Sequence, residues 1–145
     1  MTVQGVLKGA FMFMSDLVRH LTMDHRVEFM AVSSYGDSTH SDSVRIIMDL
    51  RKDIADEHVL IVEDIIDSGR TLHFLQNLLK ARNPASVSTC VFMSKSDNRN
   101  WQAVVEYLGF EAPNHWVVGY GLDYAERLRT LPYVGILKEE VYSGK

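Results

Sequence analysis

A chemically distinctive stretch follows a short apolar run near the middle of the chain. The run Val59–Val62 leads into two adjacent acids, Glu63 and Asp64, and the residues Asp67–Thr71 read D-S-G-R-T. Such a turn offers backbone amides and two hydroxyls to a phosphate, and a helix that starts there adds its dipole to the attraction. Neighbouring carboxylates suit a vicinal diol or hydrated Mg²⁺. The stretch therefore predicts a site for a ribose 5-phosphate.

The same turn has a second interpretation as the capped start of an ordinary helix. Asp67, Ser68 and Thr71 are all good helix-capping residues. The turn also matches neither of the common glycine-rich phosphate-binding patterns. Taken without the surrounding sequence, the stretch leaves both interpretations open.

Apolar runs and helical periodicity indicate the elements that must position this turn. Helices are predicted around Met14–Leu21 and Leu72–Leu79, where apolar residues recur at helical spacing. Strands are predicted at Thr2–Leu7, Val27–Ser34, Val44–Leu50, Val59–Val62, Val87–Met93, Val117–Tyr120 and Val134–Leu137. This alternation predicts an α/β domain with a mostly parallel central sheet flanked by helices. Ligands of open α/β sheets bind beyond the carboxyl ends of the strands, which is where the turn falls.

The composition excludes several classes of protein. Of the 145 residues, 46% are hydrophobic and 23% are charged, which is typical of one globular domain spanning residues 1–145. A net charge of −4 without a basic run argues against a nucleic-acid partner. No apolar run approaches the roughly 18 residues of a membrane span. The one cysteine, Cys90, allows no intrachain disulfide, and we expect a reducing cytoplasmic location.

The segment Glu63–Thr71 resembles the signature of type I phosphoribosyltransferases that binds phosphoribosyl pyrophosphate (PRPP), in particular that of the hypoxanthine–guanine branch. Further segments resemble the family in the order that the family has them. They are Leu7-Lys8-Gly9, Ser34-Tyr35 at the start of a polar loop, Lys95 after a strand, Trp116–Tyr124, and Arg129. The resemblance covers about residues 6–142. It implies the family fold, with a lid at about residues 34–43 and a small hood over the base site at about residues 96–130.

The resemblance implies how the substrate PRPP is bound. Asp67 is implied to be the catalytic base at purine N7, and Ser34 and Tyr35 are implied to belong to the lid. The peptide Lys8-Gly9 is often a cis form in the family. The implied PRPP-binding residues are Lys8, Gly9, Glu63, Asp64, Asp67, Ser68, Gly69, Arg70, Thr71 and Arg129, with Mg²⁺ as cofactor held by Glu63, Asp64 and Asp123.

The purine base is implied to bind at Lys95, Trp116, Val117 and Asp123. A lysine donates hydrogen bonds and cannot accept them, so Lys95 favours a 6-oxo over a 6-amino purine. Trp116 is implied to stack on the base. For single residues, simpler interpretations stand beside these roles: a surface lysine, a core aromatic residue and a loop acid.

The implied function is purine salvage: transfer of the phosphoribosyl group from PRPP to hypoxanthine or guanine by a homodimer or homotetramer. A xanthine-preferring enzyme, a weakly active nucleotide-binding regulator of the same fold and a partner-binding domain without chemistry are the alternatives. The sequence starts a few residues before the first matching segment, where family members usually have a few dozen more, so we expect a short N-terminus.

Overall fold

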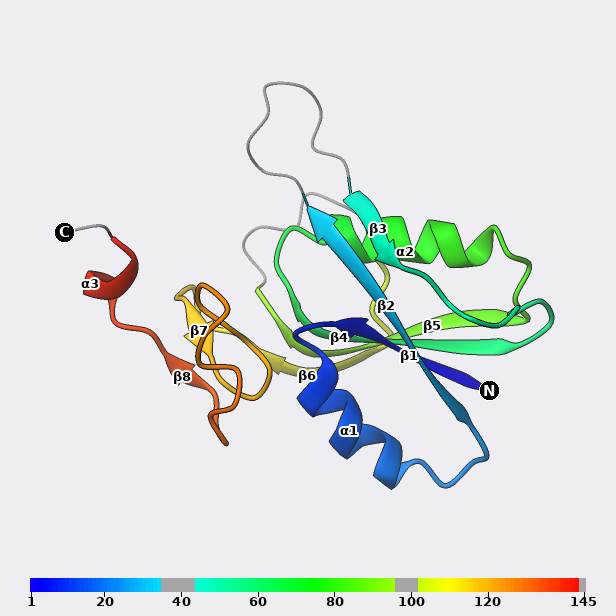
Figure 1. Cartoon of the computed structure of the whole chain (residues 1–145), viewed down its shortest axis with the longest axis horizontal. Helices are drawn as coiled ribbons and strands as arrows, with labels where there is room; N and C mark the ends of the chain where they lie inside the picture. Colours follow the sequence, from blue (N-terminus) through cyan, green and yellow to red (C-terminus); the bar gives the residue numbers. More distant parts are fainter. Residues whose placement is uncertain (35–43, 96–101, 144–145) are drawn as a thin grey trace.

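A six-stranded sheet with a helix on each face forms the centre of the molecule (Figure 1). The computed structural model describes residues 1–34, 44–95 and 102–143. The spatial order of the strands is β3 (Val44–Met48), β2 (Arg26–Ser34), β1 (Thr2–Leu7), β4 (His58–Ile66), β5 (Ser86–Ser94) and β6 (Tyr107–Glu111). All neighbouring strands are parallel except β2 and β3, which are antiparallel.

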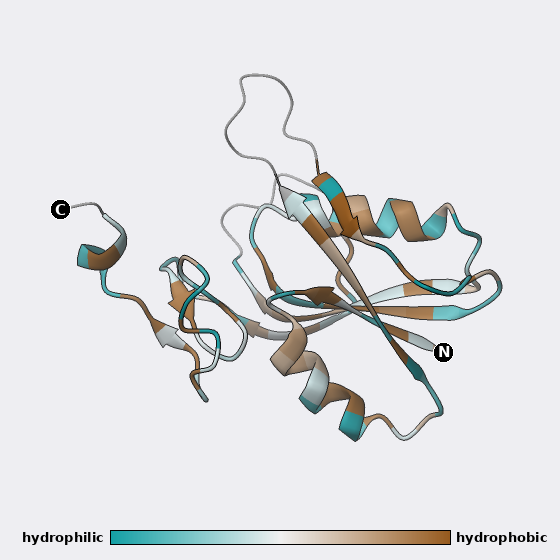
Figure 2. Ribbon diagram, in the orientation of Figure 1, coloured by the Kyte–Doolittle hydropathy of each residue, from teal (hydrophilic) through white to brown (hydrophobic). Residues whose placement is uncertain are grey.

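The two main helices are α1 (Phe11–His20) and α2 (Arg70–Lys80), and they cover opposite faces of the sheet. Side chains alternate between the faces along a strand. Accordingly, Val59 and Ile61 of β4 pack in the cluster that holds the α2 leucines, whereas Val62 packs with Met14 of α1. Figure 2 shows hydrophobic and hydrophilic stretches alternating along α2, as expected for a helix with one buried face.

Between β1 and β4, the chain changes the direction in which it adds strands to the sheet. From β1 the chain crosses by α1 to β2 on one side, whereas β4 lies on the other side of β1 and continues through α2 to β5. Such a switch point opens a crevice at the carboxyl ends of the two strands. Lys8 and Gly9 follow β1, and Glu63 and Asp64 lie in the last residues of β4. The topology therefore brings two of the predicted segments together, Leu7-Lys8-Gly9 and Glu63–Thr71.

A smaller unit follows the central sheet. It contains the two-stranded antiparallel sheet of β7 (Val117–Val118) and β8 (Gly135–Ile136), and the short helix α3 (Glu139–Tyr142). Val117 and Leu122 pack with Met93 in a cluster next to the carboxyl end of β5. None of the helices in the described ranges is long and apolar enough to cross a membrane.

The structure confirms the predicted strands of the central sheet and adds one that the sequence did not indicate. Strand β6 pairs with β5 at the sheet edge, and all five of its residues are exposed. Because no alternation of buried and exposed residues marks it, the hydrophobic pattern could not predict it. β6 falls within the range expected for the hood but extends the central sheet. Strand β4 continues to Ile66, beyond the predicted end at Val62.

Candidate active site

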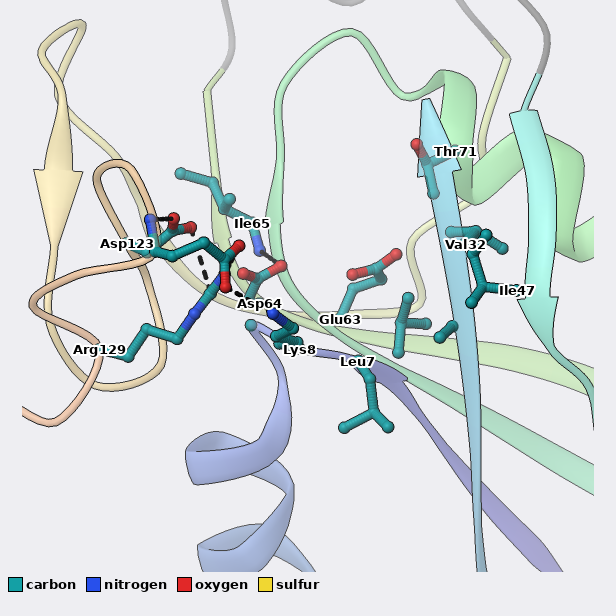
Figure 3. A pocket seen from close by; sticks show the side chains of 14 residues that line it. Leu7, Lys8, Val32, Ile47, Glu63, Asp64, Ile65, Thr71, Asp123 and Arg129 are labelled. Atoms are coloured by element: carbon teal, nitrogen blue, oxygen red, sulfur yellow. Dashed lines mark hydrogen bonds and ion pairs between the residues drawn. The ribbon is translucent and has the colours of Figure 1, made fainter. Parts of the chain in front are cut away.

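Three adjoining cavities lie at the carboxyl ends of β1, β4 and β5. Their volumes are about 590, 130 and 240 Å³, and Ile65 of β4 lines all three. The largest extends from the β1 end to Val32 of β2 and Ile47 of β3, as Figure 3 shows. We refer to them as the central, the turn and the aromatic cavity, in order of the volumes given. Together they form one continuous candidate site.

Two neighbouring carboxyl groups form the floor of the central cavity. The Glu63 side chain is buried, with 7% of its surface exposed. Burial, and then the negative charge of Asp64, raises the pKa of Glu63 well above its usual value. Burial also raises the pKa of Asp64, which the Arg129 charge partly opposes. A buried and a partly buried acid with raised pKa values are groups that a cation would stabilise in ionised form.

Gly9 makes the approach to this acidic floor possible. A methyl group at Gly9 would overlap the carboxylate of Asp64. A methyl group at Gly121 would in turn overlap the carbonyl oxygen of Gly9, and Gly121 has a φ of +100°, which favours glycine. Gly9 therefore packs against the Asp64 side chain, and the loop after β7 packs against the Gly9 backbone. Glycine is required at position 121, whereas a side chain at position 9 would displace the Asp64 carboxylate.

The turn cavity is lined by residues 66–72 together with Glu63 and Ile65. Helix α2 begins at Arg70, and its N-cap is Gly69 in a left-handed conformation with a φ of +83°. Gly69 has no side chain with which to cap the helix, and the Ser68 hydroxyl accepts a bond of 3.4 Å from the Arg70 amide. The interpretation of Ser68 as a helix-capping residue therefore stands beside the phosphate-binding one. The N-terminal amides and the dipole of a helix are a favourable place for an anion.

The aromatic cavity collects residues from three separate segments. Lys95 follows β5 and its backbone amide bonds to Ile66 of β4 at 2.9 Å, which places it beside Asp67 in the wall. Trp116 and Val117 also line this cavity. The indole N–H of Trp116 donates to the Asp123 carbonyl at 3.1 Å. Trp116 is 45% exposed and contacts the ring of Tyr124 edge-on. A half-open aromatic wall facing a lysine suits a flat polar ring.

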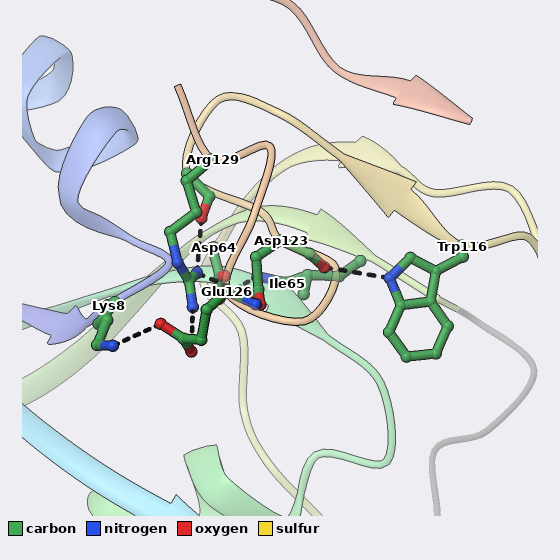
Figure 4. Close-up of polar contacts among 8 residues, drawn as sticks. Lys8, Asp64, Ile65, Trp116, Asp123, Glu126 and Arg129 are labelled. Carbon is green, nitrogen blue, oxygen red and sulfur yellow. Dashed lines mark hydrogen bonds and ion pairs between the residues drawn. The ribbon is translucent and has the colours of Figure 1, made fainter. Parts of the chain in front are cut away.

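A cluster of charges closes the other side of the central cavity (Figure 4). The Arg129 guanidinium lies 3.1 Å from an Asp123 carboxylate oxygen and 3.0 Å from Glu126. The second oxygen of Glu126 lies 2.5 Å from Nζ of Lys8, which is 118 residues away in the chain. Arg129 also donates to the Gly121 carbonyl at 2.9 Å. Lys8 and Arg129, predicted separately, therefore face the same cavity.

The loop that carries these charges is held in unusual backbone conformations. Tyr120, Ala125, Glu126 and Leu128 all have positive φ values, which is uncommon for residues other than glycine. The Tyr120 hydroxyl donates to Asp16 of α1, the helix that follows Lys8 and Gly9. Burial and the bond to Asp16 raise the pKa of Tyr120 to about 12, so the hydroxyl keeps its proton. The loop is thereby tied to α1, the helix that follows Lys8 and Gly9.

The structure also corrects one expectation and locates residues that the sequence did not single out. The cis peptide bond joins Leu7 to Lys8, one bond before the predicted Lys8-Gly9 position. Glu126 lines the central cavity without having been predicted, because its contact with Lys8 is with a residue distant in sequence. Ile65 lies within the predicted segment Glu63–Thr71 but was given no role there. Ser34 ends β2, whereas Tyr35 and the rest of the predicted lid lie outside the described residues.

The predicted acids do not form a ready-made metal cage. In residues 1–34, 44–95 and 102–143, no group of three or more histidine, cysteine or acidic side chains could hold an ion. Mg²⁺ in phosphate-handling sites is commonly bound by one or two carboxylates, with water and substrate oxygens completing the shell. The buried Glu63 and the partly buried Asp64 fit that pattern.

Comparisons with known proteins find relatives along most of the chain. Residues 1–125 match the family described as Phosphoribosyl transferase domain. Over 142 residues, or 97% of its length, the chain is 51% identical to the bifunctional protein TilS/HprT of Listeria monocytogenes, and it spans 22% of that protein. It is also 51% identical to the hypoxanthine-guanine phosphoribosyltransferase of Dictyostelium discoideum, with 95% of this chain and 79% of that protein covered. The crystal structure of a hypoxanthine phosphoribosyltransferase from Staphylococcus aureus has a TM-score of 0.92 and 43% identity, with 97% and 77% covered.

Proposed function

This chain belongs to the phosphoribosyl transferase domain family and has its type I fold, and from this premise we propose that it transfers the phosphoribosyl group of PRPP to a 6-oxopurine. The base is hypoxanthine or guanine, and the products are IMP or GMP and pyrophosphate. The reaction serves purine salvage. The relatives named as hypoxanthine or hypoxanthine-guanine phosphoribosyltransferases support this choice of base.

The observation that carries the proposal is the meeting of three chemically different cavities around Ile65. The turn cavity offers the amides at the start of a helix, the central cavity offers acids and two cations, and the aromatic cavity offers a lysine and an indole. A ribose placed between them has its 5′-phosphate, its diphosphate and its base pointing in three directions. PRPP and a purine base are a pair of substrates that place a phosphate, a diphosphate and a flat base around one ribose.

Each part of PRPP has a proposed partner. The 5′-phosphate binds the amides and hydroxyls of residues 68–71. Glu63 and Asp64 bind the ribose hydroxyls and, together with Asp123, the Mg²⁺ that accompanies the diphosphate. Lys8, Gly9 and Arg129 bind the diphosphate itself. Mg²⁺ supplies charge neutralisation for the diphosphate when it is bound.

The base is held at the aromatic cavity. Trp116 stacks on the purine, the Val117 backbone meets its edge, and Lys95 donates to O6. An adenine amino group finds no acceptor on a lysine, so adenine is rejected. These assignments follow the residues that line this cavity with Asp67.

In the reaction, N9 of the purine forms a bond to C1′ as the bond from C1′ to the diphosphate oxygen breaks, with its electron pair leaving on that oxygen. Asp67 accepts the proton that departs from N7. Lys8 and Arg129 stabilise the negative charge that develops on the diphosphate. Water competes with the base for C1′, so the reaction needs a closed site, and we assign this task to the lid at residues 34–43.

We further propose that the enzyme works in the cytoplasm as a homodimer or homotetramer. The lone cysteine, Cys90, suits a reducing compartment. Exposed apolar side chains on β6, including Tyr107 and Phe110, offer surface for contacts between subunits.

An assay with PRPP, Mg²⁺ and each of hypoxanthine, guanine, xanthine and adenine tests the proposed function. We expect nucleotide product with hypoxanthine or guanine and none with adenine. Product with xanthine in preference to both would support the xanthine-preferring alternative. Absence of product with every base, from a folded protein, would refute the enzymatic assignment.

A further inference from the structure

Glu126 occupies a position that the proposed reaction leaves unexplained. One of its carboxylate oxygens lies 2.5 Å from Lys8 and the other lies 3.0 Å from Arg129. These are the two cations that face the diphosphate side of the central cavity, and Glu126 lines the same cavity. A single carboxylate thus bridges both groups that an incoming anion needs.

The charges of this cluster are balanced internally. Lys8 and Arg129 contribute two positive charges, and Asp123 and Glu126 contribute two negative ones within ion-pairing distance. The bonds from Lys8 and then from Arg129 lower the pKa of Glu126, which keeps its carboxylate ionised. A diphosphate cannot share the same N–H donors with an ionised carboxylate without like-charge repulsion.

The backbone of Glu126 is held in a defined conformation, whereas its side chain is largely exposed. Its amide donates to Asp123 at 2.8 Å, and its φ of 64° places it in the left-handed region next to Ala125 at 49°. Non-glycine residues persist in this region where the surrounding structure demands it, often at functional sites. The side chain itself is 63% exposed, so it can swing into solvent without opening the core.

We propose that Glu126 is an internal competitor of the diphosphate group, which occupies Lys8 and Arg129 in the unliganded protein and is displaced when PRPP binds. The inference deepens the proposed function and rests on it. When pyrophosphate leaves, Glu126 takes the two cations back and lowers the net affinity for that product. Glu126 is thus a residue that tunes affinity and not one that takes part in the bond-making step.

A structural role predicts the opposite effect of mutation. If Glu126 served to brace Lys8 and Arg129 in position, its loss would weaken diphosphate binding. If it competes with diphosphate, its loss strengthens binding, and only for ligands that carry a diphosphate. The sign of the change therefore separates the two roles.

Titration calorimetry with Mg²⁺-pyrophosphate, PRPP and IMP on the full chain tests the inference. For Glu126→Gln we expect a dissociation constant for pyrophosphate about threefold to tenfold lower than for wild type, and an unchanged constant for IMP. Glu140→Gln is the matched control, because Glu140 is 74% exposed, pairs with Lys138 at 3.8 Å and lines none of the three cavities. We expect that control to bind all three ligands as wild type does.

The outcomes distinguish this inference from the function on which it rests. Wild type that binds pyrophosphate and PRPP, together with a Glu126→Gln protein that binds them equally or more weakly, overturns the inference alone. Wild type that binds neither ligand overturns the proposed function and the inference with it. An equal gain for IMP and pyrophosphate also overturns the competitor role, because IMP lacks the group for which Glu126 competes.

Discussion

The two ends of the site are built in opposite ways. The end for which we propose ribose-phosphate binding, the ribose-phosphate end, is Glu63–Thr71, a continuous segment that runs from the end of β4 into α2. The end for which we propose diphosphate binding, the diphosphate end, consists of Lys8, Asp123, Glu126 and Arg129, and joins residues 118 positions apart. The first end holds the buried acid Glu63 beside the partly buried Asp64, whereas the second is a set of ion pairs with two of its side chains more than 60% exposed.

This difference separates what each end contributes to stability and to binding. A buried acid with a raised pKa destabilises the folded protein when it is ionised, and a ligand that binds the ionised acid stabilises the fold. Exposed ion pairs contribute little to stability and are easily exchanged for a ligand. The ribose-phosphate end is therefore a socket held at a cost in folding free energy. The diphosphate end is an adjustable clamp that costs little.

The largest expected effect lies at the ribose-phosphate end, in Asp67→Asn. An asparagine keeps the size of the side chain but cannot accept the N7 proton, so we expect turnover to fall by about 10²–10³-fold. PRPP binding, measured by calorimetry, should remain close to that of wild type. Loss of PRPP binding instead would show that Asp67 serves the socket and not the proton transfer.

Gly9→Ala tests the contact that joins the two ends. The added methyl group overlaps the Asp64 carboxylate, so we expect kcat/KM to fall by about 10²-fold and the fold to lose about 1–3 kcal/mol. Gly135→Ala is the matched control, since its nearest neighbour would lie 3.5 Å away on Tyr133. Steady-state kinetics and thermal unfolding of both variants measure the difference. Similar losses in the two variants would contradict the close packing at Gly9.

Glu63→Gln tests whether the socket costs stability. Burial raises the pKa of Glu63, so its favourable contribution is complete below the unfolded value of 4.5 and is lost as pH rises through the raised folded pKa. We expect the variant to melt about 3–5 °C above wild type near about pH 8, with the gap closing toward pH 4.5. Melting curves that differ by the same amount at every pH would rule out this origin.

The smallest effects are expected at the diphosphate end of the unliganded protein. Lys8→Met and Glu126→Gln each remove one partner of an exposed ion pair, and we expect melting temperatures within about 2–3 °C of wild type. Calorimetric unfolding without ligand is the measurement. A drop in melting temperature as large as that of Gly9→Ala would mean that these ion pairs contribute substantially to folding stability. The two ends would then not differ in their contribution to stability.

Sequence reasoning predicted the features that neighbouring residues encode. The strand, turn and helix of Val59–Leu79 could be identified from an apolar run, a glycine-containing turn and leucines at helical spacing. The prediction that the acids and the turn bind a ribose phosphate rests on the same short stretch. Strand β6 could not be predicted from the sequence, because its residues are all exposed and show no periodic pattern. Its place depends on pairing with β5.

Other features came from the packing of distant segments. Lys8, Lys95 and Arg129 were predicted one at a time, and the crossover between β1 and β4 brings them to one set of adjoining cavities. Nothing near Glu126 in the sequence points to Lys8, because an ion pair across 118 residues exists only once the loop after β7 folds against the β1 end. Local patterns specify elements and their likeness to a family. The geometry among charges depends on topology and on contacts that no short window of sequence contains.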